Sequence, residues 1–449
     1  MKQRLSLLWA ILLLLAFGAT SSDFAFAQKK KGVRKQKSKV VKYTLTPDDN
    51  VFLDDLEHRA FLYFWEHSDE KTGLTLDRAK TNGDAPPPGA DHYNIASIAS
   101  TGFALTSYCI AADRNWVTLE EARQRTRNTL DFFANRAFHK NGWFYHWMDK
   151  VTGERRWKSE VSSIDTALLL GGVLTVRQCF ADNKEIVRLA TQIYERVDFR
   201  WMLNGDNYLL SHGWHPETGF IGNRWHDYSE DKILYLMAIG SPTHAISWRS
   251  WFAWERGYIA YGNYRYLAAV SPLFIHQYSH AWVDFRGRRE RYNHFHTDYF
   301  QNSIDATRAQ RQFFIDVLSK EFSHYNANVW GLTASDFQGG YVAWGAPPRH
   351  PATDGSVVPC AAGGSLMFTP DIALPALREM KTLYGAEVYQ RYGFADAFNP
   401  QTKWVDTDVI GIDVGITLLS AENLRSQNVW NWFMKNDEIK TALRKVRLF

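Results

Sequence analysis

Residues 118–136, TLEEARQRTRNTLDFFANR, carry the clearest helix signal in the chain and decide its fold class. Thr118 and Glu121 have the spacing of a capping box, in which two residues satisfy each other's free backbone N–H groups at a helix start. Apolar Leu130, Phe133 and Ala134 then recur at a spacing that places them on one helix face. We therefore predict an amphipathic helix that buries this face against other helices.

Similar signals recur along most of the chain. Thr369-Pro370-Asp371 combines a cap with Pro at the first helical position, and the helix it starts is predicted to end at Gly385. Further helices are predicted near 52–66, 95–111, 163–180, 184–199, 230–239, 302–319 and 413–424, with strand signals only in short pieces such as 142–148 and 219–225. This pattern favours an all-α fold, an (α/α) barrel or toroid in which helix hairpins close into a ring.

Four long segments separate these helices: 67–94, 138–160, 203–229 and 324–366. They are rich in Trp, Tyr, Gly, His and Pro, and loops of this length in a compact domain are usually functional. We expect these loops, with short β-hairpins, to form a cleft on one face of the barrel.

The N-terminal residues predict export. Lys2 and Arg4 precede an apolar run from Leu5 to Ala19, and Ala25-Phe26-Ala27 provides a small-x-small cleavage site, so residues 1–27 are predicted to be a signal peptide. Residues 28–45 are predicted to form a basic, disordered tail, followed by a single domain over 46–449. No later run is long and apolar enough for a membrane span. We therefore expect a periplasmic or secreted protein, and a monomer.

Charge and cysteine content narrow the function classes. Residues 43–449 carry 42 Lys and Arg against 47 Asp and Glu, so the body of the chain is mildly acidic and a nucleic-acid partner is not expected. The three cysteines allow at most one disulfide within the chain. Cys109 and Cys179 lie in apolar helical runs and are expected to be buried free thiols. None of the three has a metal-site spacing.

Aromatic residues point to a carbohydrate ligand. The chain has 18 Trp, 21 Tyr and 28 Phe, and many of the Trp, including Trp143, Trp225 and Trp344, fall in the predicted loops. Flat aromatic faces stack on sugar rings while neighbouring polar groups bind the hydroxyls. The alternative for each single Trp is that it only fastens a long loop to the body.

Three segments place carboxylates where loops meet helices: Glu160 with Asp165, Glu230, and Asp413. Glycosidic cleavage needs one carboxylic acid to protonate the leaving oxygen and one carboxylate to activate water or attack the sugar. The structural alternative is capping, because Asp165 completes a capping-box pattern with Ser162, and Glu230 and Asp413 lie at helix starts. Glu160 lies outside a helix and has the weakest structural alternative.

The roles of two of these residues are predicted from their positions. Backbone N–H groups at a helix start lower the pKa of a carboxyl group, so Asp413 is the predicted base. Glu230 is the predicted acid, because Asp231 beside it raises its pKa.

Histidines offer a rival chemistry. His294 with His296, and His276 with His280, have workable metal-ligand spacings. Neither pair has an obvious carboxylate or Cys to complete a motif, so we predict no metal site and no cofactor. No Gly-rich phosphate loop, nucleophile elbow or HExxH motif is present.

The order of several motifs resembles the bacterial glucoamylase-like domain family, which includes secreted endo-β-1,2-glucanases (glycoside hydrolase family 144-like). The resemblance covers residues 56–430. The motifs are Ser159-Glu160 with Ser163-Ile164-Asp165-Thr166-Ala167, Ser229-Glu230 with Gly240-Ser241-Pro242-Thr243-His244, Asp298-Tyr299-Phe300-Gln301-Asn302-Ser303, Gly331-Leu332-Thr333-Ala334-Ser335-Asp336, Tyr341 with Gly345-Ala346-Pro347-Pro348, and Asp413 with Glu422-Asn423.

The resemblance implies a single (α/α)6-barrel domain that hydrolyses a glucan with carboxylates and without a cofactor. It places Glu160, Glu230 and Asp413 at the family's acidic positions. The expected substrate-binding residues are Asp165, Trp143, Trp225, His244, Trp344, Tyr341 and Asp336.

The leading hypothesis is an endo-β-1,2-glucanase that acts in carbohydrate metabolism and releases short oligosaccharides. An exo-acting hydrolase that releases a disaccharide or glucose is the nearest alternative. A polysaccharide lyase with basic residues such as Arg286–Arg291 in its cleft, or a sugar-binding protein without catalysis, are alternatives from other classes.

Overall fold

The computed structural model describes residues 43–270 and 272–449, and residues 43–449 form one compact unit. The predicted signal peptide and most of the predicted basic tail lie outside the described residues. Helices dominate the described part of the chain and the sheets are small, as the sequence predicts. In this part of the chain, no helix combines the length and apolar character needed to cross a membrane.

One set of helices forms a circuit of contacts. It comprises α3 (Ile98–Asp113), α5 (Ser163–Cys179), α7 (Lys232–Gly240), α8 (Tyr278–Trp282) and α12 (Gly411–Arg425). Each helix contacts the next in this order, and α12 returns to α3. The short helix α10 (Pro359–Gly363) packs against α12.

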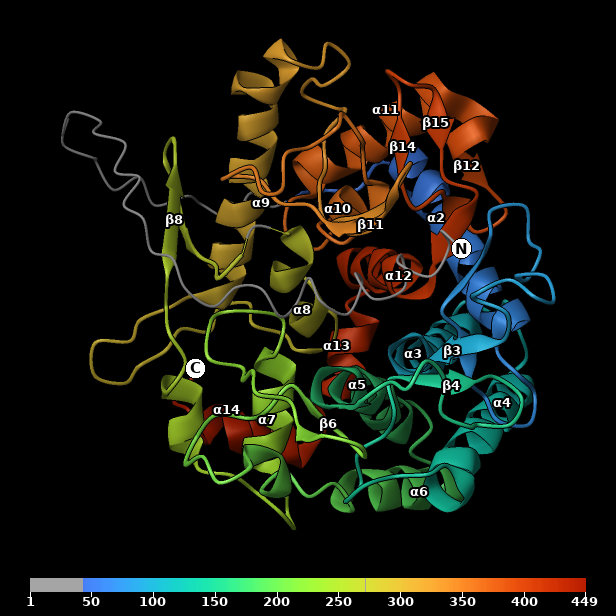
Figure 1. Cartoon of the computed structure of the whole chain (residues 1–449), viewed down its shortest axis with the longest axis vertical. Helices are drawn as coiled ribbons and strands as arrows, with labels where there is room; N and C mark the ends of the chain where they lie inside the picture. Colours follow the sequence, from blue (N-terminus) through green and yellow to red (C-terminus); the bar gives the residue numbers. More distant parts are fainter. Residues whose placement is uncertain (1–42, 271) are drawn as a thin grey trace. The chain divides into compact units, whose positions relative to one another are not determined.

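A second set of helices alternates with the first along the chain. It comprises α2 (Pro47–His67), α4 (Leu119–Asp131), α6 (Lys184–Glu195), α9 (Tyr299–Asp316) and α11 (Pro370–Val388). Helix α2 contacts α3 and α12, α4 contacts α3, and α6 contacts α5. In Figure 1, α4, α6 and α11 lie outside the group formed by α3, α5 and α12.

Local sequence explains the helix bounds. The capping box of Thr118 and Glu121 forms, and α4 continues as a π-helical turn over Phe132–Arg136, so the helix predicted over 118–136 has the right extent. Helix α11 has Pro370 at its start, as predicted. Gly385 has a φ of +53° and kinks the chain, but helical residues resume after it, so the predicted end is three residues early.

The sequence periodicity does not predict four short helices: α8, α10, α13 (Asn428–Phe433) and α14 (Asp437–Lys445). Helices α8 and α10 have five residues each, which is too few for a helical period to stand out. Both are nevertheless fully buried.

The strands are short and all paired antiparallel. They include β1 (Thr75–Leu76), β2 (Arg78–Lys80), β3 (Ile95–Ser97), β4 (Trp147–Asp149), β5 (Val161–Ser162), β6 (Gly213–His215), β7 (Gly219–Phe220), β8 (Tyr258–Tyr261), β9 (Tyr264–Leu267), β10 (Ala334–Phe337), β11 (Gly340–Ala343) and β16 (Asp408–Ile410). Pairs β12–β13 (Tyr389–Gln390, Gly393–Phe394) and β14–β15 (Phe398–Asn399, Trp404–Val405) complete the set.

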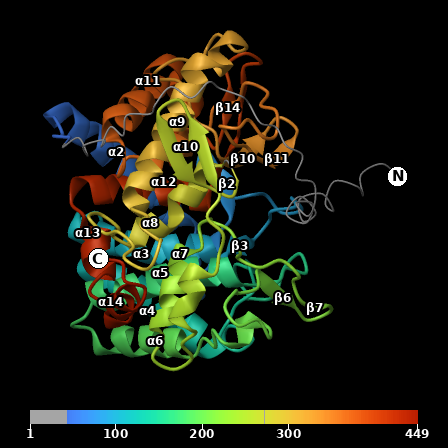
Figure 2. The same cartoon turned by 90° about the vertical axis from the view of Figure 1, so that its left-hand side faces the viewer.

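Three strands lead directly into helices of the circuit: β3 into α3, β5 into α5, and β16 into α12. The N-terminal ends of these helices therefore lie beside strands. In Figure 2, strands β2, β3, β6, β7, β10 and β11 lie on one side of the described chain, and α13 and α14 lie on the other.

Helices α3 and α5 pack with very close backbones. A Cβ atom on Gly172 would lie 2.1 Å from the Gly102 carbonyl oxygen, so only glycine fits at this crossing. The double glycine of α5, Gly171-Gly172, would weaken an isolated helix, but here it permits the contact between two helices.

Candidate active site

Four predicted carboxylates meet at the N-terminal ends of the circuit's helices. Glu160 precedes β5, Asp165 lies in the first turn of α5, Glu230 precedes α7, and Asp413 lies in the first turn of α12. The charge of Glu160 acts on Asp165, and the charge of Asp165 acts on Glu230. Both Glu230 and Asp413 act on Tyr278. We call Glu160, Asp165, Glu230 and Asp413 the carboxylate centre.

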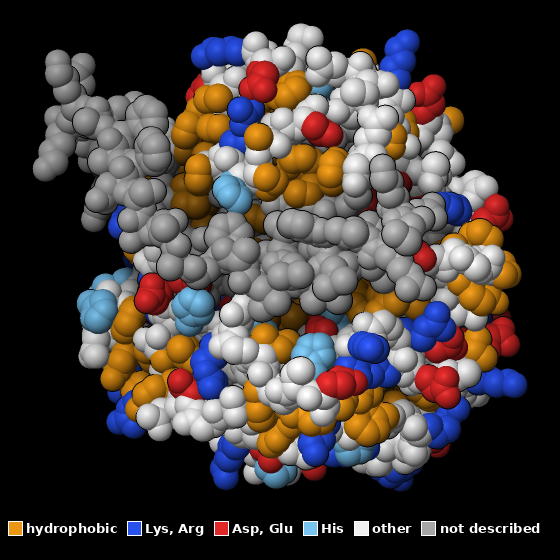
Figure 3. Space-filling view, viewed as in Figure 1, with side chains coloured by type: hydrophobic (Ala, Val, Ile, Leu, Met, Phe, Trp, Pro, Cys, Tyr) orange, Lys and Arg blue, Asp and Glu red, His pale blue; other side chains and the backbone are white. Residues whose placement is uncertain are grey.

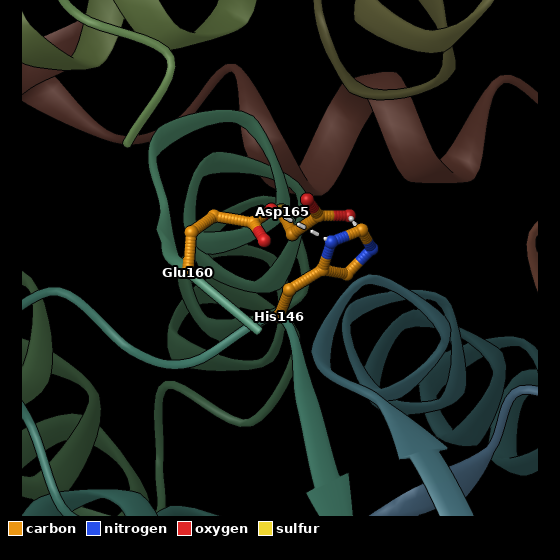
Figure 4. A group of neighbouring side chains, drawn as sticks. All are labelled: His146, Glu160 and Asp165. Carbon is orange, nitrogen blue, oxygen red and sulfur yellow. Dashed lines mark hydrogen bonds and ion pairs between the residues drawn. The ribbon is translucent and has the colours of Figure 1, made fainter. Parts of the chain in front are cut away.

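His146 joins two members of this centre (Figure 4). Its Nδ1 atom lies 2.9 Å from Oε1 of Glu160, and its Nε2 atom lies 3.3 Å from Oδ1 of Asp165. The ring stacks on Trp147 with 3.8 Å between centroids. The backbone N–H of His146 also donates to the carbonyl oxygen of Glu160 at 3.0 Å, so both the backbone and the ring hold the two residues together.

The contacts among His146, Glu160 and Asp165 determine which of the three are charged. Burial alone would lower the pKa of His146, but Asp165 and Glu160 outweigh it and raise this pKa to about 9. Burial would raise the pKa of Glu160, but His146 lowers it to about 2. Burial raises the pKa of Asp165. At neutral pH the group therefore holds an imidazolium ion between two carboxyl groups, and Glu160 is ionised.

Asp165 also caps its helix, as the structural alternative predicts. The Ser162 hydroxyl accepts from the backbone N–H of Asp165 at 3.2 Å and donates to its Oδ2 atom at 2.6 Å. The capping role and the contact with His146 use different carboxylate oxygens, so the two are compatible.

Glu230 is held by its own turn and by α8. The Ser229 hydroxyl donates to the Glu230 carboxylate, and the Ser279 hydroxyl donates to the Glu230 carbonyl oxygen. The Lys232 ammonium donates to the Ser229 carbonyl oxygen at 2.5 Å. Burial raises the pKa of Glu230, and the charge of Asp165 raises it further, as a general acid requires.

The pKa of Asp413 is higher than the sequence analysis predicts. It is 6% exposed at the start of α12, where the backbone N–H groups were expected to lower its pKa. Burial instead raises the pKa to about 6, and the charges of Asp336 and Asp77 raise it further. Hydrogen bonds with Asp396 and Cys360 lower the pKa but do not outweigh burial. Desolvation thus outweighs the helix start, and Asp413 titrates within the ordinary working range of an enzyme.

Tyr278 is affected by the charges of the carboxylate centre, and the sequence analysis missed it. It starts α8, is 6% exposed, and burial and the charge of Asp413 raise the pKa of its hydroxyl well above the usual range. The available signal lay in the run from His276 to His280, which we considered only as a metal site.

The histidines of this run are core residues. His276 and His280 are at most 2% exposed, and burial lowers the pKa of both well below the usual range. Their rings contact the Tyr228 hydroxyl and the Ser303 hydroxyl, each at 3.2 Å.

A second acidic group adjoins Asp413. It surrounds the Arg78 guanidinium and comprises Asp77, Asp336, Asp396, Asp406 and Asp408. Arg78 contacts Asp336 at 2.6 Å, and the Asp336 backbone N–H donates to Asp396 at 2.7 Å. We call these five carboxyl groups the aspartate cluster. The cluster includes Asp336, an expected substrate-binding residue, whose charge acts on Asp413.

Two groups among the described residues have the composition and spacing to hold a metal ion: His146, Glu160 and Asp165, and also Asp336, Asp396 and Asp406. In the first, the ion pairs already occupy the ring nitrogens. Neither group contains the histidine pairs that the sequence suggested.

The predicted aromatic residues separate into two groups. Trp225 stacks on His212 and donates to the Ser163 hydroxyl at 2.9 Å, next to the start of α5. Tyr341 lies in β11 opposite Asp336 and is 47% exposed. Trp344 follows this hairpin and is 3% exposed, and its indole N–H has no protein partner.

Trp143 and His244 lie elsewhere. Trp143 is fully buried, and its indole N–H donates to the Asp198 carbonyl oxygen at 2.9 Å, so it is a core residue and not an accessible sugar platform. His244 contacts the Asp198 carboxylate at 3.8 Å, beyond the end of α7 opposite to Glu230. The nine residues of α7 span about 13 Å, which separates His244 from the carboxylate centre.

Residues 222–437 match the family model Glycoamylase, described as "putative glucoamylase". Over these residues the chain is similar to the glucoamylase-like domain family, which its ordered motifs also resemble.

A curated relative is the exo-β-1,2-glucooligosaccharide sophorohydrolase (non-reducing end) of Parabacteroides distasonis. It is 25% identical over 469 residues, which cover 96% of this chain and 62% of the relative. The chain therefore spans less than two thirds of the length of that enzyme.

Two solved structures resemble the chain closely. The endo-β-1,2-glucanase of Chitinophaga pinensis, in complex with sophorotriose and glucose, has a TM-score of 0.82 and 26% identity over 90% of this chain and 98% of its own. A glucoamylase-like protein of Bacteroides fragilis has a TM-score of 0.81 and 28% identity over the same shares.

Proposed function

We propose that the chain is a glycoside hydrolase that cleaves β-1,2-linked glucan on an (α/α)6 barrel, with Glu230 as acid. The observation that carries the proposal is the convergence of Glu230, Asp413 and the Glu160–Asp165 pair from the starts of three helices. The similarity to a β-1,2-glucanase and to a β-1,2-glucooligosaccharide hydrolase supports the linkage.

In the proposed reaction, Glu230 donates its proton to the glycosidic oxygen as the bond to the anomeric carbon breaks. Its raised pKa keeps the proton in place until the substrate binds. A second carboxylate takes a proton from the water that attacks the anomeric carbon. Asp413 is our candidate for this base, and Glu160, ionised at neutral pH, is the alternative.

The remaining site residues are proposed to bind sugar. Asp165, Asp336 and Tyr341 offer hydroxyl partners, and Trp225 and Trp344 border the same region. Trp143 and His244 are excluded because their neighbours place them away from the centre.

We further propose endo action, with short oligosaccharides as products. Exo action is the second candidate, because the curated relative is named as an exo-acting enzyme. Products from linear β-1,2-glucan separate the two: a ladder of oligomers early in the reaction supports endo action, and a single disaccharide from the start supports exo action.

The test of the reaction compares the full chain on β-1,2-, β-1,3-, β-1,4- and α-1,4-glucans, with products followed by mass and by reducing ends. Glu230→Gln and Asp413→Asn should each lower turnover by about 10²–10⁴-fold with an unchanged circular dichroism spectrum. Asp305→Asn in α9 is the control, because burial raises the pKa of that carboxyl to about 6 outside the centre. Unchanged turnover in both variants would refute the assignment.

Azide separates the two candidate bases. It needs no deprotonation to attack, so it should restore turnover to the variant that lacks the base. Rescue of Asp413→Asn alone supports Asp413, and rescue of Glu160→Gln alone assigns the role to Glu160.

We also propose that residues 1–27 export the chain, that it acts as a monomer in the periplasm or the medium, and that 46–449 is the catalytic domain. An N-terminus near Gln28 in exported protein and a monomer mass by light scattering are the expected results.

A further inference from the structure

Two cysteines occupy matching places on the closely packed helices α3 and α5. Gly102 and Gly172 mark the crossing where the backbones touch. Cys109 and Cys179 each lie seven residues further along the same helices. Seven residues are close to two helical turns, so both cysteines return to the faces on which the glycines meet.

The surroundings of the two thiols agree with this spacing. Burial raises the pKa of the Cys109 thiol well above the usual range, and the neighbouring Cys179 side chain raises it further; both cysteines are free thiols in the structure. Cys109 is 1% exposed, whereas Cys179 is half-buried at the last residue of α5. The prediction of a buried thiol is therefore right for Cys109 and wrong for Cys179. Cys360 is not a rival partner, because it lies in α10 and contacts Asp413.

We propose that Cys109 and Cys179 form a disulfide in the exported protein and so link α3 to α5. The predicted compartment supplies disulfide-bearing oxidants. The thiolate of half-buried Cys179 attacks the oxidant's disulfide and releases one thiol. Cys109 then attacks the sulfur of Cys179 and releases the second thiol. Two thiols of this chain and one oxidant disulfide thus yield one new disulfide and two oxidant thiols.

The proposed bond lies far from the carboxylate centre. Cys179 is fourteen residues beyond Asp165 on α5, which corresponds to about 21 Å along the helix. Activity at low temperature should therefore be the same in the oxidised and reduced chain. The proposal rests on the proposed export but not on the proposed reaction.

The test counts thiols in the purified full chain. The protein is equilibrated with reduced and oxidised glutathione a few degrees below its unfolding temperature, where local opening admits glutathione, and is then alkylated in denaturant. One alkylated thiol is expected, and three after reduction. A non-reduced tryptic digest should contain residues 81–114 linked to residues 178–184.

Stability provides a second readout. Reductant should lower the Tm of the wild-type chain by about 5 °C, because a cross-link over this long loop restricts the unfolded chain. The Tm of Cys179→Ser should not respond to reductant. Three alkylated thiols after equilibration, stable glutathione adducts, or a bond to Cys360 would each overturn the proposal.

Discussion

At the scale of single residues, the charge of His146 connects two carboxyl groups that the sequence presents separately. The ring contacts Glu160 and Asp165 through different nitrogen atoms, so only the protonated ring donates to both. An imidazolium ion here keeps Glu160 ionised, whereas burial raises the pKa of Glu230 and favours its protonated form.

The His146 contacts predict a pH-dependent stability. The folded-state pKa of about 9 exceeds the ordinary value of 6.5, so the contribution of the charged ring is complete below pH 6.5 and is lost as pH rises through 9. His146→Gln should therefore destabilise the chain by roughly 2 kcal/mol at pH 6 and much less at pH 10. Urea unfolding of both proteins at the two pH values measures this, and an equal cost at both would contradict it.

The pKa of Asp413 predicts a pH dependence of activity. As the base, Asp413 must be ionised, so kcat/KM should rise with pH through about 6. Asp77→Asn removes a negative charge that raises this pKa, and should move the rise to lower pH by about half a unit. Profiles of wild type, Asp77→Asn and the control Asp305→Asn test this. A shift to higher pH in Asp77→Asn would exclude Asp413 as the titrating base.

The sequence indicates the acidic residues of the site but not their partners. Glu160, Glu230 and Asp413 stand out because they lie next to helix starts. His146 and Tyr278 have no such signal, because a backbone hydrogen bond between separate segments holds His146 beside Glu160, and Tyr278 lies in a five-residue helix. The pKa of Asp413 was misjudged for a related reason, because desolvation depends on distant chain segments.

At the scale of elements, the contact between α3 and α5 carries the sharpest packing prediction. Gly172→Ala would place a methyl group 2.1 Å from the Gly102 carbonyl oxygen, so the helices must separate. We expect a loss of about 3 kcal/mol in the free energy of unfolding. Gly222→Ala is the control, because a Cβ atom there meets nothing within 4 Å. Similar stability of the two variants would contradict the close packing.

Elements also differ in how well sequence predicts them. Long helices with caps, such as α4 and α5, have nearly the predicted bounds, because capping and periodicity are local. Short helices α8 and α10 are stabilised by burial among other segments. Their sequence alone does not contain that information.

At the scale of the whole molecule, charges are interspersed on the face drawn in Figure 3. Lys and Arg side chains alternate there with Asp and Glu, without a continuous basic surface among the visible described residues. This agrees with a neutral polysaccharide as the proposed substrate and not a nucleic acid.

Distant parts of the chain are joined by a buried ionic network. Arg425 of α12 contacts Glu57 of α2 at 2.5 Å, and Arg114 at the end of α3 contacts Glu422 of α12 at 2.6 Å. Both carboxylates are fully buried, and burial with the charge of Glu422 raises the pKa of Glu57 to about 8. The network thus ties the first described helix to the last helix of the circuit.

This network predicts that removing one arginine destabilises the chain and that also removing its carboxylate partner restores part of the stability. Arg425→Ala leaves Glu57 and Glu422 with one cation, and should cost about 3 kcal/mol in the free energy of unfolding. At pH 9, where Glu57 is ionised in the wild-type chain, adding Glu57→Gln should recover much of this loss because the unpaired charge disappears. Arg349→Ala at the surface pair with Glu321 is the control and should cost less than about 1 kcal/mol. Denaturant titration at pH 9 measures the wild type, the Arg425→Ala and Glu57→Gln variants, the double variant and the control, five proteins in all. Equal losses in the two arginine variants would refute the network's contribution.

The entry of β3, β5 and β16 directly into α3, α5 and α12 has an evolutionary consequence. The proposed acid Glu230 and the proposed base Asp413 lie on separate loops, each next to the N-terminal end of a different helix of the circuit. An insertion in one loop can therefore lengthen, narrow or block a groove without any change in how the helices of the circuit pack. Descendants of such a scaffold can change which polymer they accept, or where along it they cut, by inheriting new loops while retaining the same acid.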